Sequence, residues 1–256
     1  MSESDDAPVI RVRDLAIGYG SKVIQRDLAF DVAAGDVFVI LGGSGCGKST
    51  LLRTMTGLQP ALGGTVAIQG VASLPPPLDE APPFGVMFQS GALFGSMSLL
   101  ENVALPLRSW TDLDAAAVEA VALARLRLVG LGGFENHLPA EISGGMKKRC
   151  GIARALALEP KLLFLDEPSA GLDPVTAVEL DDLLTTLSDQ LGVTMVIVTH
   201  ELESIFRIAK HCIMLDASAG TMIAQGDPRE LRDHASDARV HRFFNREPSR
   251  AGLTPD

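Results

Sequence analysis

The sequence predicts an α/β protein in which helices cover both faces of a mainly parallel sheet. Short apolar runs such as KLLFLDE (161–167) and VTMVIVTH (193–200) end on polar residues and alternate with segments of helical periodicity. A β-rich run that ends in LGG (41–43) continues through a glycine-rich loop into the helix-like KSTLLRTMTGL (48–58). Strands that are apolar throughout and are joined by helices are typical of buried parallel sheets.

The remaining elements are expected around a helical insertion, because helical periodicity is continuous from about residue 99 to 156. The other segments are, in chain order, β-rich runs at 9–19 and 28–43, a strand at 64–70, a proline-rich surface connection at 74–83, a strand at 84–89, helices at 174–191 and from 201, a hairpin at 211–226, and a helix followed by an extension at 227–248.

Composition argues against several classes of protein. Apolar residues make up 46% of the 256 residues, yet no uninterrupted apolar run reaches the roughly 18 to 20 residues of a membrane-spanning helix. The formal net charge of −10 disfavours broad contact with nucleic acid phosphates, so no nucleic acid partner is expected. Cys46, Cys150 and Cys212 are too widely spaced to suggest a zinc site or a redox pair, and we expect them to be reduced and buried.

We expect a single composite domain at residues 9–241, with the helical insertion at about 91–159. The acidic start, MSESDDAP (1–8), lacks the basic and apolar regions of a secretory signal and is expected to be a flexible tail. Residues 242–256 are expected to form a C-terminal extension that docks on a partner subunit.

The segment GGSGCGKST (42–50) matches the pattern G-x-x-x-x-G-K-[ST] between a strand and a helix. Glycines let backbone N–H groups surround the β- and γ-phosphates, Lys48 adds a positive charge, and the Ser49 hydroxyl is a ligand for Mg²⁺. The candidate ATP-binding residues here are Gly42, Gly43, Ser44, Gly45, Cys46, Gly47, Lys48, Ser49 and Thr50. The sequence therefore predicts nucleotide binding.

Three polar side chains follow two of the apolar strands. Asp166 and Glu167 end one strand and His200 ends another, so all three are expected at the sheet edge where nucleotides bind. In that position Asp166 is suited to hold the magnesium shell and Glu167 to polarise a water molecule. His200 is suited to contact a γ-phosphate oxygen or to orient the attacking water.

With these residues the chain resembles the ATP-binding cassette (ABC) ATPases over nearly its whole length. The resemblance rests on six elements in order, namely Tyr19, the phosphate loop, Gln89, Ser143-Gly144-Gly145 before a helix, Asp166-Glu167 followed by SAGLD (169–173), and His200. It implies a P-loop NTPase core with an antiparallel β subdomain and an inserted helical subdomain. It also implies ATP hydrolysis with ATP and Mg²⁺ as cofactors.

The resemblance further implies a head-to-tail homodimer with two composite ATP sites. Ser143, Gly144 and Gly145 of one subunit would cap the γ-phosphate held by the other, and Asp173 would communicate across the dimer. Tyr19 would stack on adenine. Gln89 would join Ser49 and Asp166 around Mg²⁺, contribute to catalysis with Glu167 and His200, and link the site to a transport partner.

Within the family, four segments are similar to the ATPases of Mla/Mkl-type phospholipid transporters: 88–107, 143–149, 201–209 and 241–245. This similarity implies an integral-membrane permease, an MCE-domain lipid-binding protein, and a peripheral position on the cytoplasmic face of the inner (plasma) membrane. The alternatives are the ATPase of a solute transporter and a non-transport ABC ATPase acting on ribosomes or DNA. Met146 stands where the family usually has glutamine, which removes a hydrogen-bonding group beside the signature.

Two clusters have more than one interpretation. Leu93, Phe94, Met97, Leu99 and Leu100 follow Gln89 closely, and they form either a groove for a permease helix or core of the helical insertion. Lys147, Lys148 and Arg149 are expected to form a solvated face rather than a site for lipid headgroups.

Overall fold

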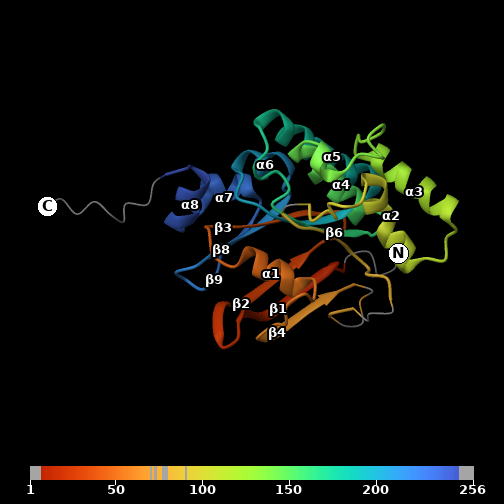
Figure 1. Ribbon diagram of the computed structural model, residues 1–256. Helices are drawn as coiled ribbons and strands as arrows, with labels where there is room; N and C mark the ends of the chain where they lie inside the picture. The colour runs from red at the N-terminus through yellow and green to blue at the C-terminus, as the bar shows by residue number, and fades with distance from the viewer. Residues whose placement is uncertain (1–6, 70, 72–73, 77–79, 90, 248–256) are drawn as a thin grey trace, which may run out of the picture.

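The computed structural model describes residues 7–69, 71, 74–76, 80–89 and 91–247, and Figure 1 shows them as two sheets with helices around them. The strands are β1 (Ile10–Tyr19), β2 (Lys22–Val32), β3 (Val37–Gly42), β4 (Gly63–Ile68), β5 (Gly85–Met87), β6 (Leu162–Asp166), β7 (Thr194–Val198), β8 (His211–Asp216) and β9 (Thr221–Gly226). The helices are α1 (Lys48–Met55), α2 (Leu99–Trp110), α3 (Ala115–Leu128), α4 (Gly144–Ala155), α5 (Pro174–Leu191), α6 (Leu202–Ile208), α7 (Pro228–His234) and α8 (Ala238–Phe244).

The central sheet has the strand order β5-β6-β7-β3-β8-β9, and all neighbours are parallel except β8 and β9. Every residue of β3, β6 and β7 is buried, as expected for strands covered on both faces. This arrangement confirms the predicted mainly parallel sheet. The carboxyl ends of β3, β6 and β7 lie at one edge, which positions the loops that follow them.

The second sheet is antiparallel, with the order β2-β1-β4, and it confirms the expected antiparallel subdomain. Helix α1 lies between the two sheets (Figure 1), and its Leu51 and Leu52 are fully buried there. Phe30 of β2 stacks on Phe38 of β3 with ring centroids 5.3 Å apart. These contacts join the small sheet to the nucleotide-binding core.

The β-rich run expected at 28–43 is divided between two strands, β2 and β3, which belong to different sheets. The chain turns between β2 and β3 at Gly35, which has a left-handed backbone with φ of 69°. The Gly35 N–H donates to the hydroxyl of Thr194, 2.9 Å away, and ties the turn to β7. Strand periodicity continues on both sides of this turn, so the pattern alone did not reveal it.

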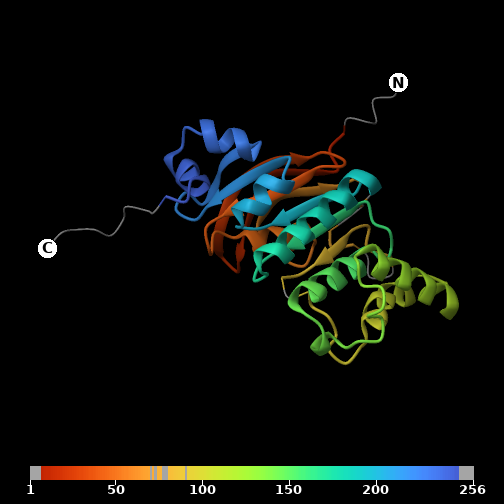
Figure 2. The ribbon, with the colours of Figure 1, turned by 90° about the horizontal axis from the view of Figure 1, so that it is seen from above.

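Helices α2, α3 and α4 form the expected helical insertion, which Figure 2 shows at one side of the molecule in yellow-green and green. Ser98 and Glu101 form a capping box that starts α2. The helices pack through buried residues such as Val103, Ala122 and Cys150. The insertion therefore has an apolar core that is continuous with one face of the central sheet.

The C-terminal part of the described chain contains two short helices, α7 and α8, where the sequence suggested one helix and an extension. Phe244 of α8 is buried, with its ring centroid 5.7 Å from that of Phe206. The boundary expected between residues 241 and 242 thus falls inside α8. Most of the expected acidic tail (residues 1–6) and the end of the chain (residues 248–256) lie outside the described residues.

All three cysteines are buried and free, as expected from their spacing. Burial raises the pKa of the Cys150 and Cys212 thiols to about 12, and it also raises the pKa of Cys46. Within the described ranges, no helix combines the length and the apolar character needed to cross a membrane.

Candidate nucleotide site

The loop between β3 and α1 has the backbone that its glycines predict. Gly47 caps α1 with φ of 101°, and Gly42 has φ of 143°; a Cβ on Gly42 would lie 2.4 Å from the carbonyl oxygen of Leu215. Only glycine fits this approach. The first N–H groups of α1 have no helical partner, so the loop and the helix start form a cradle for an anion. The Lys48 ammonium lies over the loop and donates to the Gly42 carbonyl at 2.8 Å.

Gln25 supports this loop from β2, and sequence reasoning missed it. Its side chain is fully buried, and its amide nitrogen donates to the carbonyl oxygens of Cys46 (2.7 Å) and Asp216 (3.1 Å). The Cys46 side chain points inward, because a Cβ on Gly42 would lie 2.5 Å from its sulfur. Cys46 therefore supports the cradle from beneath and does not line the cavity.

Ser49 and Asp166 meet across the end of β6. The Ser49 hydroxyl donates to Asp166 Oδ1 at 3.1 Å, and burial raises the pKa of Asp166. A hydroxyl and a carboxylate beside a phosphate cradle fit the oxygen ligands that Mg²⁺ prefers. In the described part of the chain, no cluster of three or more histidine, cysteine and acidic side chains is placed to hold a metal ion.

Glu167 and His200 are also brought together as the sequence predicted. His200 Nδ1 lies 2.8 Å from Glu167 Oε1, and the Glu167 N–H donates to the Val198 carbonyl at 2.8 Å. Glu167 has a left-handed backbone with φ of 51°, which is uncommon for a residue with a Cβ. Its Oε2 is buried and has no hydrogen-bond partner among the described residues. Glu167 thus lines the cavity with its carboxylate in contact with His200 through Oε1.

A cavity of about 740 Å³ lies beside the phosphate loop, Glu167 and His200, and Asp166 is not among its lining residues. Every predicted residue of the phosphate loop except Cys46 lines it, together with Tyr19, Gln89, Glu167 and His200. Tyr19 is half exposed, and its hydroxyl lies 3.0 Å from the Thr50 hydroxyl, so its ring stands at one end of the cavity. The sequence gave no signal for three further lining residues: Ile24, Arg53 and Phe243.

Ser143, Gly144, Gly145 and Asp173 do not line this cavity. Ser143 is the N-cap of α4, and its hydroxyl accepts from the Met146 N–H at 3.2 Å. Asp173 caps α5 and accepts from the N–H groups of Val175 and Thr176, each at 3.1 Å. The hydrogen bonds from Thr176 and Val175 lower the pKa of Asp173. The fold therefore places the start of α4 away from the cavity at the start of α1 within one chain.

Lys148 departs from the sequence expectation of a solvated face. It is only 7% exposed, and its ammonium donates to the backbone carbonyls of Gln89 and of Glu167. Arg149 points elsewhere on the helix and pairs with Glu179 at 3.1 Å. Helical periodicity places successive residues about 100° apart, so three adjacent cations do not share one face.

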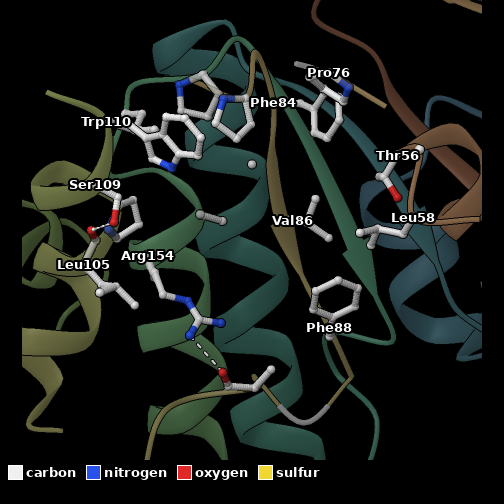
Figure 3. Close-up of a pocket in the computed structure, with 18 of the residues that line it drawn as sticks. Thr56, Leu58, Pro76, Phe84, Val86, Phe88, Leu105, Ser109, Trp110 and Arg154 are labelled. Atoms are coloured by element: carbon white, nitrogen blue, oxygen red, sulfur yellow. Dashed lines mark hydrogen bonds between the residues drawn. The ribbon is translucent and has the colours of Figure 1, made fainter. Parts of the chain in front are cut away.

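A second cavity, of about 620 Å³, lies beside β5 and is largely apolar (Figure 3). Trp110 of α2, Phe84 and Phe88 on either side of β5, and Arg154 of α4 point into it in Figure 3. Of the five apolar residues with two interpretations, Phe94 lines this cavity, and Leu99 belongs to the core. The other three, Leu93, Met97 and Leu100, are half-buried and are not among the lining residues.

Comparisons with known proteins agree with this site. Residues 25–170 match the model of the family described as ABC transporter. The chain is 39% identical over 240 residues to a probable ribonucleotide transport ATP-binding protein, mkl, of Mycobacterium leprae, covering 92% of this chain and 68% of the relative. It is 35% identical over 249 residues to the intermembrane phospholipid transport system ATP-binding protein MlaF of Escherichia coli K12, covering 95% of this chain and 91% of the relative.

Among solved structures, the fold is similar to a dimeric ATP-binding cassette in a post-hydrolysis state bound to ADP and Pi. The TM-score is 0.76 with 27% sequence identity, over 85% of this chain and 98% of that one. A cassette of this fold is thus known with the products of hydrolysis in place. The family match and the geometry of the cavity together show that this chain belongs to the ABC transporter family and is an ATP-binding, ATP-hydrolysing subunit.

Proposed function

We propose that this ATPase powers the transport of phospholipid between membranes, through a separate permease and an MCE-domain lipid-binding protein. The observation that carries the proposal is the similarity to MlaF, which extends over 95% of this chain and 91% of the relative. The chain itself would act as a peripheral subunit on the cytoplasmic face of the inner membrane.

The proposed roles at the nucleotide site follow from the contacts described above. Backbone N–H groups of the phosphate loop and the Lys48 ammonium bind the β- and γ-phosphates. Ser49, Asp166 and Gln89 hold Mg²⁺, which when bound neutralises charge on the phosphates. Glu167 polarises the attacking water, and His200 orients that carboxylate through the 2.8 Å contact with Oε1. Tyr19 stacks on adenine.

A homodimer would complete the site. Because Ser143, Gly144 and Gly145 lie away from the cavity of their own chain, their helix start is available to the γ-phosphate of a second subunit. Asp173 begins α5 beside that helix, since Thr176 packs against Gly145. Each dimer would then contain two composite ATP sites.

The apolar cavity beside β5 is the proposed docking site for the permease. It adjoins Phe88, the residue before Gln89, and its lining comes from both the core and the helical insertion. A helix of the permease with an apolar face would cover Trp110 and Phe94, which lie beside the already buried Phe84. Binding of the permease helix would therefore affect the position of Gln89 and, through it, the nucleotide site.

The test is a tagged purification from detergent-solubilised membranes, with mass spectrometry of the copurifying proteins and lipids. We expect a permease, an MCE-domain protein and phospholipid with the unchanged chain. Phe94→Asp should reduce recovery of the permease at least about 10-fold, because a charge in an apolar interface loses its hydration. The control is Leu113→Asp, which changes a similarly exposed leucine away from the cavity.

Recovery of a solute permease without phospholipid would contradict phospholipid as the transported substrate. The assignment of the chain as an ATPase would not change. The mycobacterial relative is named as a probable ribonucleotide transport protein, which makes a solute transporter the second candidate. Equal loss of the permease with Phe94→Asp and Leu113→Asp would instead contradict the docking site.

A further inference from the structure

Lys148 connects two segments of the nucleotide site that are distant in the sequence. Its ammonium donates to the carbonyl oxygen of Gln89, after β5, and to the carbonyl oxygen of Glu167, after β6, the second at 2.8 Å. Gln89 and Glu167 both line the nucleotide cavity. Lys148 itself comes from the second turn of α4, the helix that begins at Ser143.

The surroundings of Lys148 are unusual for a lysine. The side chain is buried, and the described residues give it no ion pair within 4.0 Å. Burial lowers the pKa of Lys148, while the carboxylates of Glu167 and Asp166 raise it. A buried charge without an ion-pair partner costs stability. Such a cost favours a role for Lys148 in placing other groups over a role in holding the fold.

Glu167 needs such placement because its backbone is in the left-handed region, with φ of 51°. Three contacts fix the residue. Its N–H donates to Val198, its Oε1 meets His200, and its carbonyl accepts from Lys148. A hydrogen bond from an ammonium is stronger than one from a neutral donor. Lys148 therefore fixes the peptide plane that follows Glu167, and with it the direction of the carboxylate.

Helix α4 also holds the segment after Gln89. Arg154 donates to the carbonyls of Gly91 (2.9 Å) and Ala92 (2.8 Å). A Cβ on Gly151 would lie 3.2 Å from the Cα of Gly91, so helix and segment are in close contact. Gly91 and Ala92 are thus held against α4, and Lys148 connects the same helix to Gln89 and to Glu167.

We propose that Lys148 is a positioning residue for ATP hydrolysis, which aligns the Glu167 carboxylate and the Gln89 segment with the bound nucleotide. The proposal rests on the role proposed for Glu167. It places one buried cation between the helix that carries Ser143 and the carboxylate that polarises water.

The test compares Lys148→Met, which keeps the length and removes the donor, with Lys148→Gln, which keeps a neutral donor. Lys147→Met is the control, since it removes a half-buried cation from the next position of the same helix. The full-length proteins are assayed for kcat and KM in MgATP, for the Kd of a non-hydrolysable ATP analogue, and for thermal unfolding.

Lys148→Met should lower kcat about 10-fold or more, while the Kd for the analogue changes less than about 3-fold, because the phosphate loop is intact. Lys148→Gln should recover most of kcat, and Lys147→Met should match the unchanged chain. In a Glu167→Gln background, Lys148→Met should cost no further activity, because the carboxylate that it aligns is gone.

The other outcomes show whether the role of Glu167 or the role of Lys148 is wrong. Substantial turnover by Glu167→Gln would remove the role of that carboxylate and this proposal with it. If Glu167→Gln is inactive and the separate Lys148→Met variant is fully active, the role proposed for Lys148 is wrong and that of Glu167 stands. Equal losses of analogue binding and kcat, or an unfolded Lys148→Met beside a fully active Lys148→Gln, would assign the ammonium to binding or to stability and would overturn the proposal.

Discussion

Two adjacent carboxylates, Asp166 and Glu167, have different surroundings although they follow the same strand. Asp166 ends β6 and accepts a hydrogen bond from Ser49. Glu167 turns away through its left-handed backbone and meets His200. The sequence predicted both at the sheet edge because an apolar strand ends there. It did not predict the turn at Glu167, since glutamate has no intrinsic preference for that conformation.

A third acidic residue, Asp181 of α5, is buried outside the site. It is 2% exposed, its Oδ1 has no partner among the described residues, and Arg207, Asp182 and Ser204 are the polar groups that act on it. Burial raises its pKa to about 6 from 3.8. The folded protein therefore holds a proton on Asp181 at a pH where the unfolded chain releases it.

This pKa shift predicts a pH-dependent contribution to stability. Because the pKa is raised in the folded state, the contribution is complete below pH 4 and is lost as the pH rises through about 6. Asp181→Asn has no such loss. Its free energy of unfolding should equal that of the unchanged chain at pH 4 and exceed it by on the order of 2 kcal/mol at pH 8.

Urea unfolding of both proteins at pH 4, 6 and 8 measures this difference. Asp181→Leu removes both the charge and the polar atoms of the side chain, so it separates the effect of ionisation from that of the polar contacts of Asp181. A constant difference between Asp181→Asn and the unchanged chain at all three pH values would contradict the assignment.

At the scale of elements, the order and type of most helices and strands were predictable. The central strands are apolar throughout, and α5 was predicted at its observed bounds because Pro174 and Gly192 mark its ends. The inward direction of Lys148 was not predictable, because three adjacent cations give no information about which one faces the core. Gln25 was equally hidden, since its two acceptors are backbone carbonyls that any residues present.

Helix α8 also escaped prediction as a structural element. Arg239 anchors its first turn to Asp216 at 2.9 Å, and Phe244 packs on Phe206 in its last turn. Phe243, from the same turn, lines the nucleotide cavity. The end of α8 therefore belongs to the fold and to one wall of the site.

Truncation distinguishes this role from that of a detachable extension. Deletion after His241 removes Phe243 and Phe244, and it should lower the free energy of unfolding by about 3 to 5 kcal/mol, the usual cost of losing a buried phenylalanine. Among the described residues, deletion after Asn245 removes Arg246 and Glu247 with their exposed pairs to Glu203 and His241, and it should change the free energy of unfolding by less than about 1 kcal/mol. Denaturant unfolding of both proteins measures this, and equal stabilities would contradict the packing role of α8.

At the scale of the whole molecule, the main feature is the separation of the start of α1 from the start of α4. The start of α1 lines the cavity, whereas the start of α4 does not. In the proposed head-to-tail dimer, the start of α4 in each chain would complete the cavity of the other. The sequence alone raised this arrangement only through the family resemblance, because Ser-Gly-Gly before a helix is a common helix cap.

Mixing two inactive chains tests the dimer. Lys48→Ala disables the phosphate loop, and Ser143→Arg blocks the other helix start. If the sites are composite, the mixed dimer has one intact site, and an equal mixture should recover about a quarter of the activity of the unchanged chain. ATP hydrolysis after co-expression measures this recovery.

The control replaces the Ser143→Arg chain with one that carries both changes, which leaves every site incomplete. Mixtures that stay as inactive as the separate chains, although mixed dimers are recovered, would show that Ser143 acts within its own chain.

The three buried cysteines have a practical consequence for labelling the protein. Maleimides and similar probes react with thiolates, and thiols with a pKa near 12 supply few of them at neutral pH. A cysteine introduced at an exposed position, such as Asp173 or Ser143, would outcompete the native ones. Fluorescent or spin labels can thus be attached beside the start of α4 without removing Cys46, Cys150 or Cys212.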